Sequence, residues 1–160
     1  MGTAAKKLRN ESHALDETDR ALIAALAGNA RQSLADLART VGLSGPSVAE
    51  RLRRLEEAGP VTGYSVDLDH RALGYGLTAI VRIRPLPGQL HMVEKLLVES
   101  PEVIECDKVT GDDCYIARYV LRSIDELDPI LDKIAQRAQT STSIVKATPI
   151  KRRLPPLPEA

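Results

Sequence analysis

Apolar residues recur every three to four positions through residues 15–58, in three short segments. This spacing is typical of helices that bury one face. The predicted inward residues are Leu22, Ile23 and Leu26 in the first segment, Leu34, Leu37, Ala38 and Val41 in the second, and Val48, Leu52 and Leu55 in the third. Asp16 precedes the first segment as a cap and Gly28 closes it. The pattern predicts a three-helix unit over residues 15–59.

The second and third segments follow one another without a spare residue. Ser33 and Asp36 form a capping-box pattern at the start of the second helix, and Gly42 can adopt the left-handed conformation that ends it. We expect Leu43 to plug the core and Ser44 to cap the next helix. A capped helix, a tight turn and a second helix indicate a helix-turn-helix.

The third helix has a polar outer face. At about 100° per residue, the residues that point away from its core are Pro46, Ser47, Glu50, Arg53, Arg54 and Glu57, with Arg51 at the edge. We assign Ser47 and Glu50 to base reading, and Arg51 and Arg54 to bases or phosphates. Backbone N–H groups of Ser44 and Gly45 suit a phosphate at the helix N-terminus. The full set of candidate DNA-binding residues is Ser33, Ser44, Gly45, Pro46, Ser47, Glu50, Arg51, Arg53 and Arg54.

An ordinary amphipathic helix is the alternative for this segment. Glu50, Glu56 and Glu57 offset its three arginines, as they would on a solvated charged face. The capped helix and turn that precede it favour the DNA-binding interpretation.

The pattern changes after Gly59 from helical spacing to strand alternation. Strands are predicted at residues 61–68, 77–84, 102–109, 114–121 and 142–148, and helices at 90–100 and 124–138. Ser123 and Glu126 read as a capping box for the last helix. From residue 77 the order is strand, helix, strand, strand, helix, strand, which predicts an α+β, ferredoxin-like βαββαβ sandwich. Both helices then cover one face of the sheet, and the other face retains apolar surface that a second subunit can bury.

Composition narrows the possible partners. The chain has 160 residues, 43% of them hydrophobic and 28% charged, with 22 Lys and Arg against 22 Asp and Glu. Zero net charge predicts modest non-specific DNA affinity and dependence on paired half-sites. Absence of Phe and Trp argues against stacking on single strands, so duplex DNA is the better target. No apolar run reaches the ~20 residues of a membrane span, and no secretory signal is present, so we expect a cytoplasmic protein.

The cysteines and histidines indicate neither a metal site nor catalysis. His13, His70 and His91 share no spacing, and no C-x-x-C occurs. Cys106 and Cys114 lie symmetrically about residues 109–113 and would face each other across a regular hairpin, which leaves a thiol sensor or two small semi-buried side chains as alternatives.

The two ends of the chain carry weaker signals. Residues 1–14 read as a flexible arm. The tail KRRLPPLPEA reads as a polyproline ligand or as an extended segment that packs near a neighbour or stays in solvent.

The order and spacing of these parts resemble the Lrp/AsnC (feast/famine) family of transcriptional regulators over about residues 15–150. The matching pieces are LDETDRALIAAL, LADLARTVGLS, VAERLRRLEEAG, TGYSVDLD and VTGDDCY. The resemblance implies a DNA-binding N-terminal domain and a C-terminal domain that forms dimers, often tetramers or octamers, and senses small molecules, frequently amino acids. It implies neither catalysis nor a required metal or cofactor.

The resemblance also implies an effector loop. The corresponding residues are Thr110, Gly111, Asp112, Asp113, Cys114 and Tyr115. Gly111 permits a turn whose N–H groups can hold a carboxylate, while Asp112 or Asp113 can pair with an amino group. A plain hairpin turn is the alternative. Two positions depart from the family pattern: Asp113 and Cys114 stand where many members have an aromatic residue followed by Asp, and Pro60 stands where an aliphatic residue opens the linker strand.

The predicted organisation is a flexible arm at 1–14, a helix-turn-helix domain at 15–60, a linker strand and hinge at 61–76, an effector-binding and oligomerisation domain at 77–150, and a Pro-rich tail at 151–160. We therefore predict a homo-oligomeric, sequence-specific regulator that binds double-stranded DNA and responds to a small metabolite, with an amino acid as the expected class. The alternatives are a nucleoid-structuring protein with little sequence choice, and an enzyme or metabolite-binding module on the ferredoxin-like half.

Overall fold

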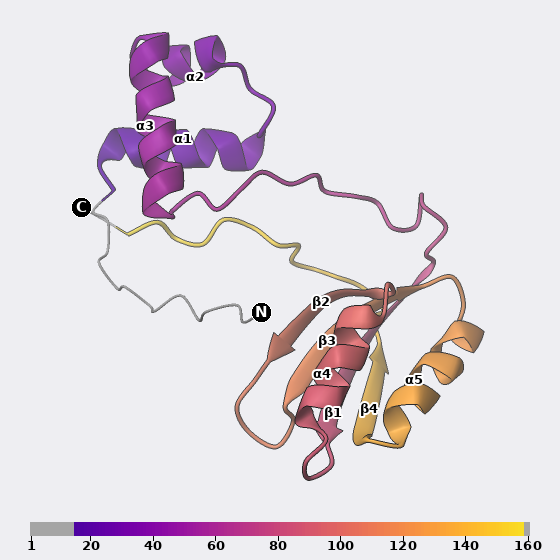
Figure 1. Ribbon diagram of the computed structural model, residues 1–160. Helices are drawn as coiled ribbons and strands as arrows, with labels where there is room; N and C mark the ends of the chain where they lie inside the picture. The colour runs from indigo at the N-terminus through magenta and orange to yellow at the C-terminus, as the bar shows by residue number, and fades with distance from the viewer. Residues whose placement is uncertain (1–14, 159–160) are drawn as a thin grey trace. The chain divides into compact units, whose positions relative to one another are not determined.

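The computed structural model describes residues 15–158, which form two compact units (Figure 1). One unit comprises the chain up to Val66 together with the segment from Ile150 onward, and the other comprises Asp67–Pro149. The predicted arm at residues 1–14 lies outside the described residues. None of the helices within residues 15–158 has the length and apolar character needed to cross a membrane.

The first unit contains the three predicted helices, α1 (Glu17–Gly28), α2 (Leu34–Val41) and α3 (Gly45–Ala58). Their packed core is Leu22, Leu37 and Val48, each at most 2% exposed. A second small cluster, made of Leu15, Ile23 and Leu55, joins the start of α1 to the last turns of α3. The predicted three-helix unit is therefore confirmed.

The caps form as the sequence indicates. The Asp16 carboxylate accepts the N–H of Asp19 at 2.8 Å, and Ser33 and Asp36 form a reciprocal capping box. Gly42 ends α2 at φ +67°, and Ser44 caps α3. Leu43 is 36% exposed, so the prediction that it plugs the core is wrong. Its main role is at the turn, where its N–H donates to the carbonyl of Ala38 and helps close α2.

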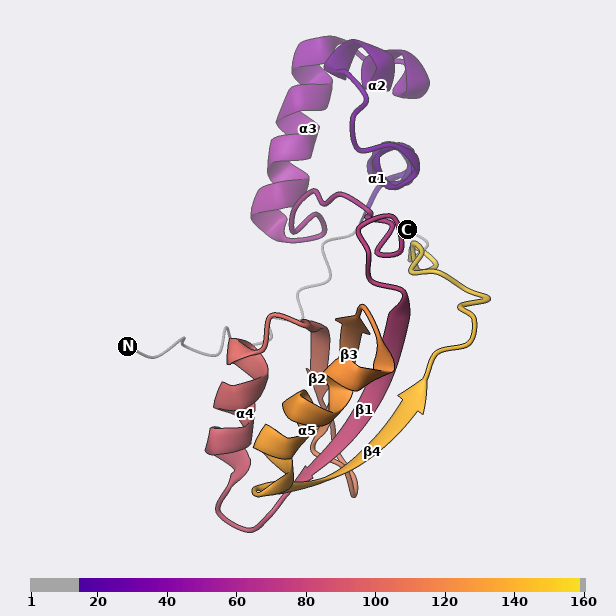
Figure 2. The same cartoon turned by 90° about the vertical axis from the view of Figure 1, so that its right-hand side faces the viewer.

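The second unit is a four-stranded antiparallel sheet with the order β2-β3-β1-β4. Its elements in chain order are β1 (Leu77–Pro85), α4 (Leu90–Glu99), β2 (Val103–Lys108), β3 (Tyr115–Leu121), the short 3-10 helix η1 (Ile124–Glu126), α5 (Leu127–Ala135) and β4 (Ala138–Ile144). Helices α4 and α5 cover the same face of the sheet (Figures 1 and 2). This arrangement confirms the ferredoxin-like plan. Ala79, Val81 and Ile83 of β1 point into the core and are fully buried.

Two details at the end of the sheet differ from the prediction. β4 occupies 138–144 instead of 142–148, because α5 ends at Ala135 and β4 pairs with β1 from Pro85↔Ala138 onward. The expected capping box at Ser123 does not form. Glu126 instead accepts the N–H of Arg122 at 2.9 Å, and the chain begins this helix as the 3-10 turn η1.

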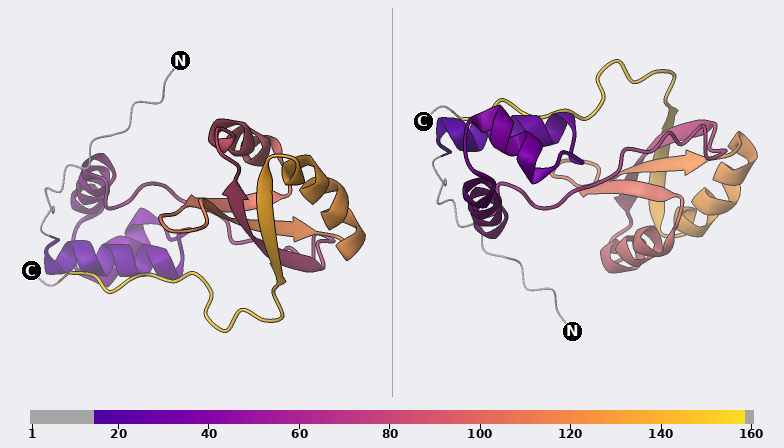
Figure 3. Two further views of the ribbon diagram at one scale, coloured as in Figure 1. Left: turned by 90° about the horizontal axis from the view of Figure 1, so that it is seen from below. Right: turned by 90° about the horizontal axis from the view of Figure 1, so that it is seen from above.

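The predicted strand over 61–68 is not formed in the part of the chain that the structure describes. Residues 61–69 are extended but belong to no strand, and Val66 is 81% exposed (Figure 3). Strands need a hydrogen-bonded neighbour, and alternation alone does not supply one. The residues have strand character without a pairing partner inside residues 15–158.

Candidate DNA interface and effector loop

The N-terminal turn of α3 is presented to solvent. Ser44, Pro46 and Ser47 are exposed and Gly45 is partly exposed. The hydroxyls of Ser44 and Ser47 lie 2.8 Å apart, and the N–H of Ser47 donates to Ser44 Oγ at 3.4 Å. Because the first N–H groups of a helix lack intrahelical acceptors, this turn can meet a phosphate or base edge. The structure thus brings four of the predicted DNA-binding residues together on one exposed turn.

Arg51 and Arg54 have partners inside the protein. Arg51 Nη1 lies 2.6 Å from Asp16 Oδ2 and 2.8 Å from Asp19 Oδ1. Arg54 Nη2 lies 3.0 Å from Asp19 Oδ2. The Asp19 side chain is only 1% exposed, so its carboxylate depends on these guanidinium groups for compensation. Both arginines therefore hold α3 against α1, a role that the helical wheel did not reveal.

This charge cluster perturbs the groups that form it. Hydrogen bonding from Arg51 and from the Asp19 backbone lowers the pKa of Asp16 below its ordinary value of 3.8. The bonds to Asp16 and Asp19 raise the pKa of Arg51 in turn. Both shifts favour the charged forms of Asp16 and Arg51, so this ion pair persists to a lower pH than the ordinary pKa of Asp16 would allow.

Arg53 lies on the exposed face but is also paired. It contacts Glu50 at 2.6 Å through Nη2 and contacts Glu57 through Nη1. The hydrogen bond from Arg53 lowers the pKa of Glu50. The outer face of α3 therefore carries its positive charge between two carboxylates, consistent with the neutral composition of the chain.

Ser33 lies at the start of α2 and is exposed. Its hydroxyl donates to Asp36 Oδ2 at 2.6 Å, and Arg39 contacts the same carboxylate. The side chain of Ser33 is thus committed to the helix cap.

The loop between β2 and β3 is a tight, exposed turn. Gly111 has φ +109°, a conformation that favours glycine, and the turn is closed by Val109 N–H donating to the Cys114 carbonyl at 2.9 Å. Arg84 Nε donates to the Asp112 carbonyl at 2.7 Å, while the Asp112 carboxylate is 95% exposed and 3.7 Å from Arg84 Nη2. The turn therefore offers an exposed carboxylate beside a guanidinium.

Arg84 is a site residue that the sequence interpretation missed. It stands on the outward positions of β1, and Ile83 pairs with Tyr115, which brings Arg84 beside the loop. The alternation of β1 contained this signal, because Arg84 follows the buried Ile83 at the end of the strand.

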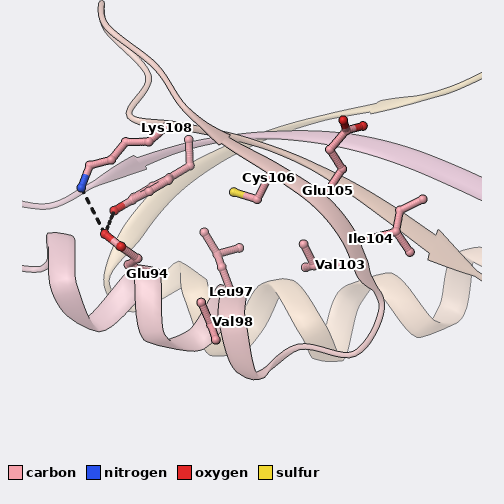
Figure 4. A pocket seen from close by; sticks show the side chains of 9 residues that line it. Glu94, Leu97, Val98, Val103, Ile104, Glu105, Cys106 and Lys108 are labelled. Carbon is pink, nitrogen blue, oxygen red and sulfur yellow. Dashed lines mark hydrogen bonds and ion pairs between the residues drawn. The ribbon is translucent and has the colours of Figure 1, made fainter. Parts of the chain in front are cut away.

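Tyr115 does not share the loop's surface. Its ring is buried at 2% exposure under α4, and its hydroxyl donates to Glu94 Oε2 at 2.7 Å. Lys108 Nζ contacts the same oxygen at 3.1 Å, and together these bonds lower the pKa of Glu94. All three side chains line a cavity of about 350 Å³ between α4 and β2, and Figure 4 shows Glu94 and Lys108 together at one end of it.

The two cysteines do not face each other. The register pairs Cys106 with Ala117, whereas Cys114 lies at the turn, so the predicted juxtaposition is wrong. Cys106 lines the cavity under β2, and burial raises the pKa of its thiol. Symmetry in sequence failed here because the β2–β3 hairpin closes around residues 109–114, which pairs Lys108 with Tyr115 and therefore Cys106 with Ala117.

Comparison with known proteins shows that each of the two units matches a domain of the same protein family. Residues 15–56 match the family model of the AsnC-type helix-turn-helix domain, and residues 78–155 match that of the Lrp/AsnC ligand binding domain. The HTH-type transcriptional regulator LrpA of Mycobacterium tuberculosis is 37% identical over 82% of this chain and 88% of its own. The chain belongs to the Lrp/AsnC family.

Other members of the Lrp/AsnC family agree over more of the chain. The regulatory protein AsnC of Escherichia coli is 32% identical over 91% of this chain and 99% of its own length. A feast or famine regulatory protein from M. tuberculosis, solved in complex with L-methionine, has 35% identity and a TM-score of 0.81, covering 88% of this chain and 98% of that one. As a member of this family, the protein is a helix-turn-helix transcriptional regulator with a ligand-binding domain.

Proposed function

We propose that the regulator reads duplex DNA with the N-terminal turn of α3 and that an amino acid bound at the 110–114 loop controls it. The single observation that carries the DNA-reading part is the exposure of Ser44, Pro46 and Ser47 on a capped helix N-terminus. Serine hydroxyls contact base edges, and free N–H groups contact phosphates. Two recognition helices about one DNA turn apart, ~34–36 Å or a multiple of it, predict imperfect palindromic operators.

The candidate DNA-binding residues are proposed to fall into two groups, those that contact DNA and those that support α3. Ser44, Gly45, Pro46, Ser47, Glu50 and Arg53 lie on the side of α3 that is proposed to approach DNA. Arg51 and Arg54 are proposed to act first as supports, because Asp19 already binds both guanidinium groups. A phosphate can draw Arg54, which is 46% exposed, more readily than Arg51, which is 28% exposed. Ser33 is assigned to the phosphate backbone through its helix N-terminus.

The sheet face opposite α4 and α5 is proposed to pair with a second copy. Ile80 and Ile116 lie on this face and are partly buried. Arg82 and Arg118 flank these apolar side chains on the same face, since they occupy the outward positions of β1 and β3. An apolar centre with a charged border suits a homodimer, which supplies the paired recognition helices.

The effector is proposed to be an amino acid. The loop offers Gly111 and Thr110 for backbone contacts, Arg84 for a carboxylate, and Asp112 or Asp113 for an amino group. Cys114 closes the loop through its backbone, since its carbonyl accepts from the N–H of Val109 and its N–H donates to the carbonyl of Ile83, while Tyr115 supports the loop from beneath. The L-methionine complex of the M. tuberculosis relative supports this ligand class.

DNA reading is tested by selecting operator sequences from a random pool and measuring binding at fixed salt. Ser47→Ala should lower affinity for the selected operator by ~1–3 kcal/mol of binding free energy while leaving random-sequence binding unchanged. Glu56→Ala, exposed on another side of α3, is the matched control. Equal affinity for operator and random DNA would replace this function with low-specificity DNA structuring.

Effector binding is tested by a thermal-shift screen of amino acids and oxo acids. A ligand selective for the folded protein raises its melting temperature by mass action. Arg84→Ala should abolish the shift if Arg84 holds the ligand carboxylate, whereas Arg82→Ala on the same strand should retain it. An undiminished shift in Arg84→Ala contradicts the assignment of this residue.

A further inference from the structure

The C-terminal segment returns to the DNA-binding unit. After β4, residues 150–158 belong to the same compact unit as α1, α2 and α3 (Figures 1 and 2). Within 151–158 Leu157 is the only residue that is not exposed. It packs against the cluster of Leu15, Ile23 and Leu55, which Val61 also borders. We call these four residues the socket and residues 150–158 the strap.

A polar contact accompanies the apolar one. Arg20 Nη1 donates to the Leu15 carbonyl at 2.8 Å and lies 3.5 Å from the Pro158 carbonyl. Arg20 thus fixes the chain at the start of α1 and touches the strap immediately after Leu157. The strap is therefore held by the apolar contact of Leu157 with the socket and by a polar contact at the next residue, Pro158.

The sequence of the strap suits this docking. Pro155, Pro156 and Pro158 flank Leu157, and each proline fixes its own φ. A segment that is already extended loses less conformational entropy when it binds. One leucine can therefore hold the strap, although the remainder of the strap stays exposed.

The socket lies at the junction of α1 and α3, where contacts between the two helices fix the orientation of α3. Leu55 is fully buried at the last turns of α3, and Ile23 belongs to α1. The Asp19 ion pairs with Arg51 and Arg54 join the same two helices. Removing the leucine side chain exposes apolar surface at this α1–α3 junction, so the helix pair opens more readily.

We propose that Leu157 is the plug of a C-terminal strap that completes the DNA-binding unit of its own chain and keeps α3 in its reading orientation. The effect on DNA rests on the function proposed above. Because the strap continues from β4 and docks on the socket through non-covalent contacts, it adds a second link between the ligand-binding sheet and the DNA-binding helices, beside the covalent link through residues 59–76. Undocking of the strap is consequently a route by which changes in the sheet weaken DNA binding.

Hydrogen–deuterium exchange of the full-length protein tests the strap without reference to DNA. Leu157→Asp should lower the protection of α1 and α3 amides by about five- to tenfold and leave β1 and β3 unchanged. Leu154→Asp is the matched control, since Leu154 is 39% exposed and lies outside the socket cluster. Unchanged protection of α1 and α3 in Leu157→Asp would overturn the proposal.

Two further measurements separate the parts of the inference. Operator affinity should fall in Leu157→Asp by about the same factor as amide protection, and it should remain normal in Leu154→Asp. Normal operator affinity in Leu157→Asp would refute the proposal that the strap keeps α3 in its reading orientation. If the wild type binds no operator, the proposed function fails while the exchange result still decides the strap. Mixing isotope-labelled chains truncated after residue 149 with full-length chains should not restore protection to the truncated chain. Restoration would show that a second copy's strap fills the socket, which refutes same-chain docking.

Discussion

Replacing Asp19 with Ala tests the ion-pair cluster that joins α1 to α3. The Asp19 carboxylate accepts three contacts from two guanidinium groups, at 2.8, 3.0 and 3.1 Å, and is 1% exposed. Each charge-assisted hydrogen bond contributes about 1.5–3 kcal/mol when fully formed. Simple addition overestimates the loss, because Arg51 keeps its bond to Asp16 and Arg54 regains water. We therefore expect the DNA-binding unit to lose ~2–3 kcal/mol of unfolding free energy.

The assay must report on this unit separately from the sheet. Hydrogen exchange of α1 and α3 amides under increasing urea gives the opening free energy of these helices. Glu17→Ala is the matched control, because Glu17 is exposed in the first turn of the same helix. A loss below about 0.5 kcal/mol for Asp19→Ala would refute the reasoning, since that is the range of ordinary surface substitutions. Additive effects of Asp19→Ala and Arg54→Ala in a double-mutant cycle would also contradict direct coupling.

Two other predictions follow from buried or perturbed groups. Asp16 has a folded-state pKa below 3.8, so its stabilising contribution is present above pH 3.8 and is lost as the pH falls through the lower folded value. Asp16→Asn keeps a capping side chain but cannot titrate. In pH-dependent denaturation this variant should therefore lose less stability than the wild type at acid pH, which flattens the acid limb of the curve. A limb of unchanged steepness would contradict this role. The Tyr119 hydroxyl is buried without a hydrogen-bond partner among residues 15–158, so Tyr119→Phe should leave stability unchanged or raise it by up to ~1 kcal/mol in thermal denaturation, whereas a clear loss would reveal a missed partner.

Local signals predicted the helix-turn-helix well. Helix caps such as Asp16 and Ser33 depend on residues three positions apart, so sequence spacing specifies them directly. The direction of the Arg51 and Arg54 side chains depends on Asp19, which is more than thirty positions away. A helical wheel places Arg54 on the outer face and Arg51 at its edge, and it contains no information about a buried carboxylate on another helix.

The effector loop likewise combines a feature that the local sequence predicts with features that depend on residues distant in the sequence. The positive φ of Gly111 was predictable, since the turn favours glycine at that conformation. Arg84 entered the site through the register between β1 and β3, and Tyr115 left it because its side chain points to the covered face of the sheet. Both outcomes depend on strand pairing, which alternation within one strand does not determine.

The unpaired segment at 61–69 predicts that the stability of the protein depends on its concentration. Its N–H and C=O groups form no strand ladder with any part of residues 15–158, and Tyr64, Val66 and Leu68 are all more than half exposed. Such an edge gains hydrogen bonds and apolar cover only when another molecule adds a strand to it. If a second copy supplies that strand, as the proposed homodimer implies, dilution should lower the melting temperature, because separated copies lose this contact.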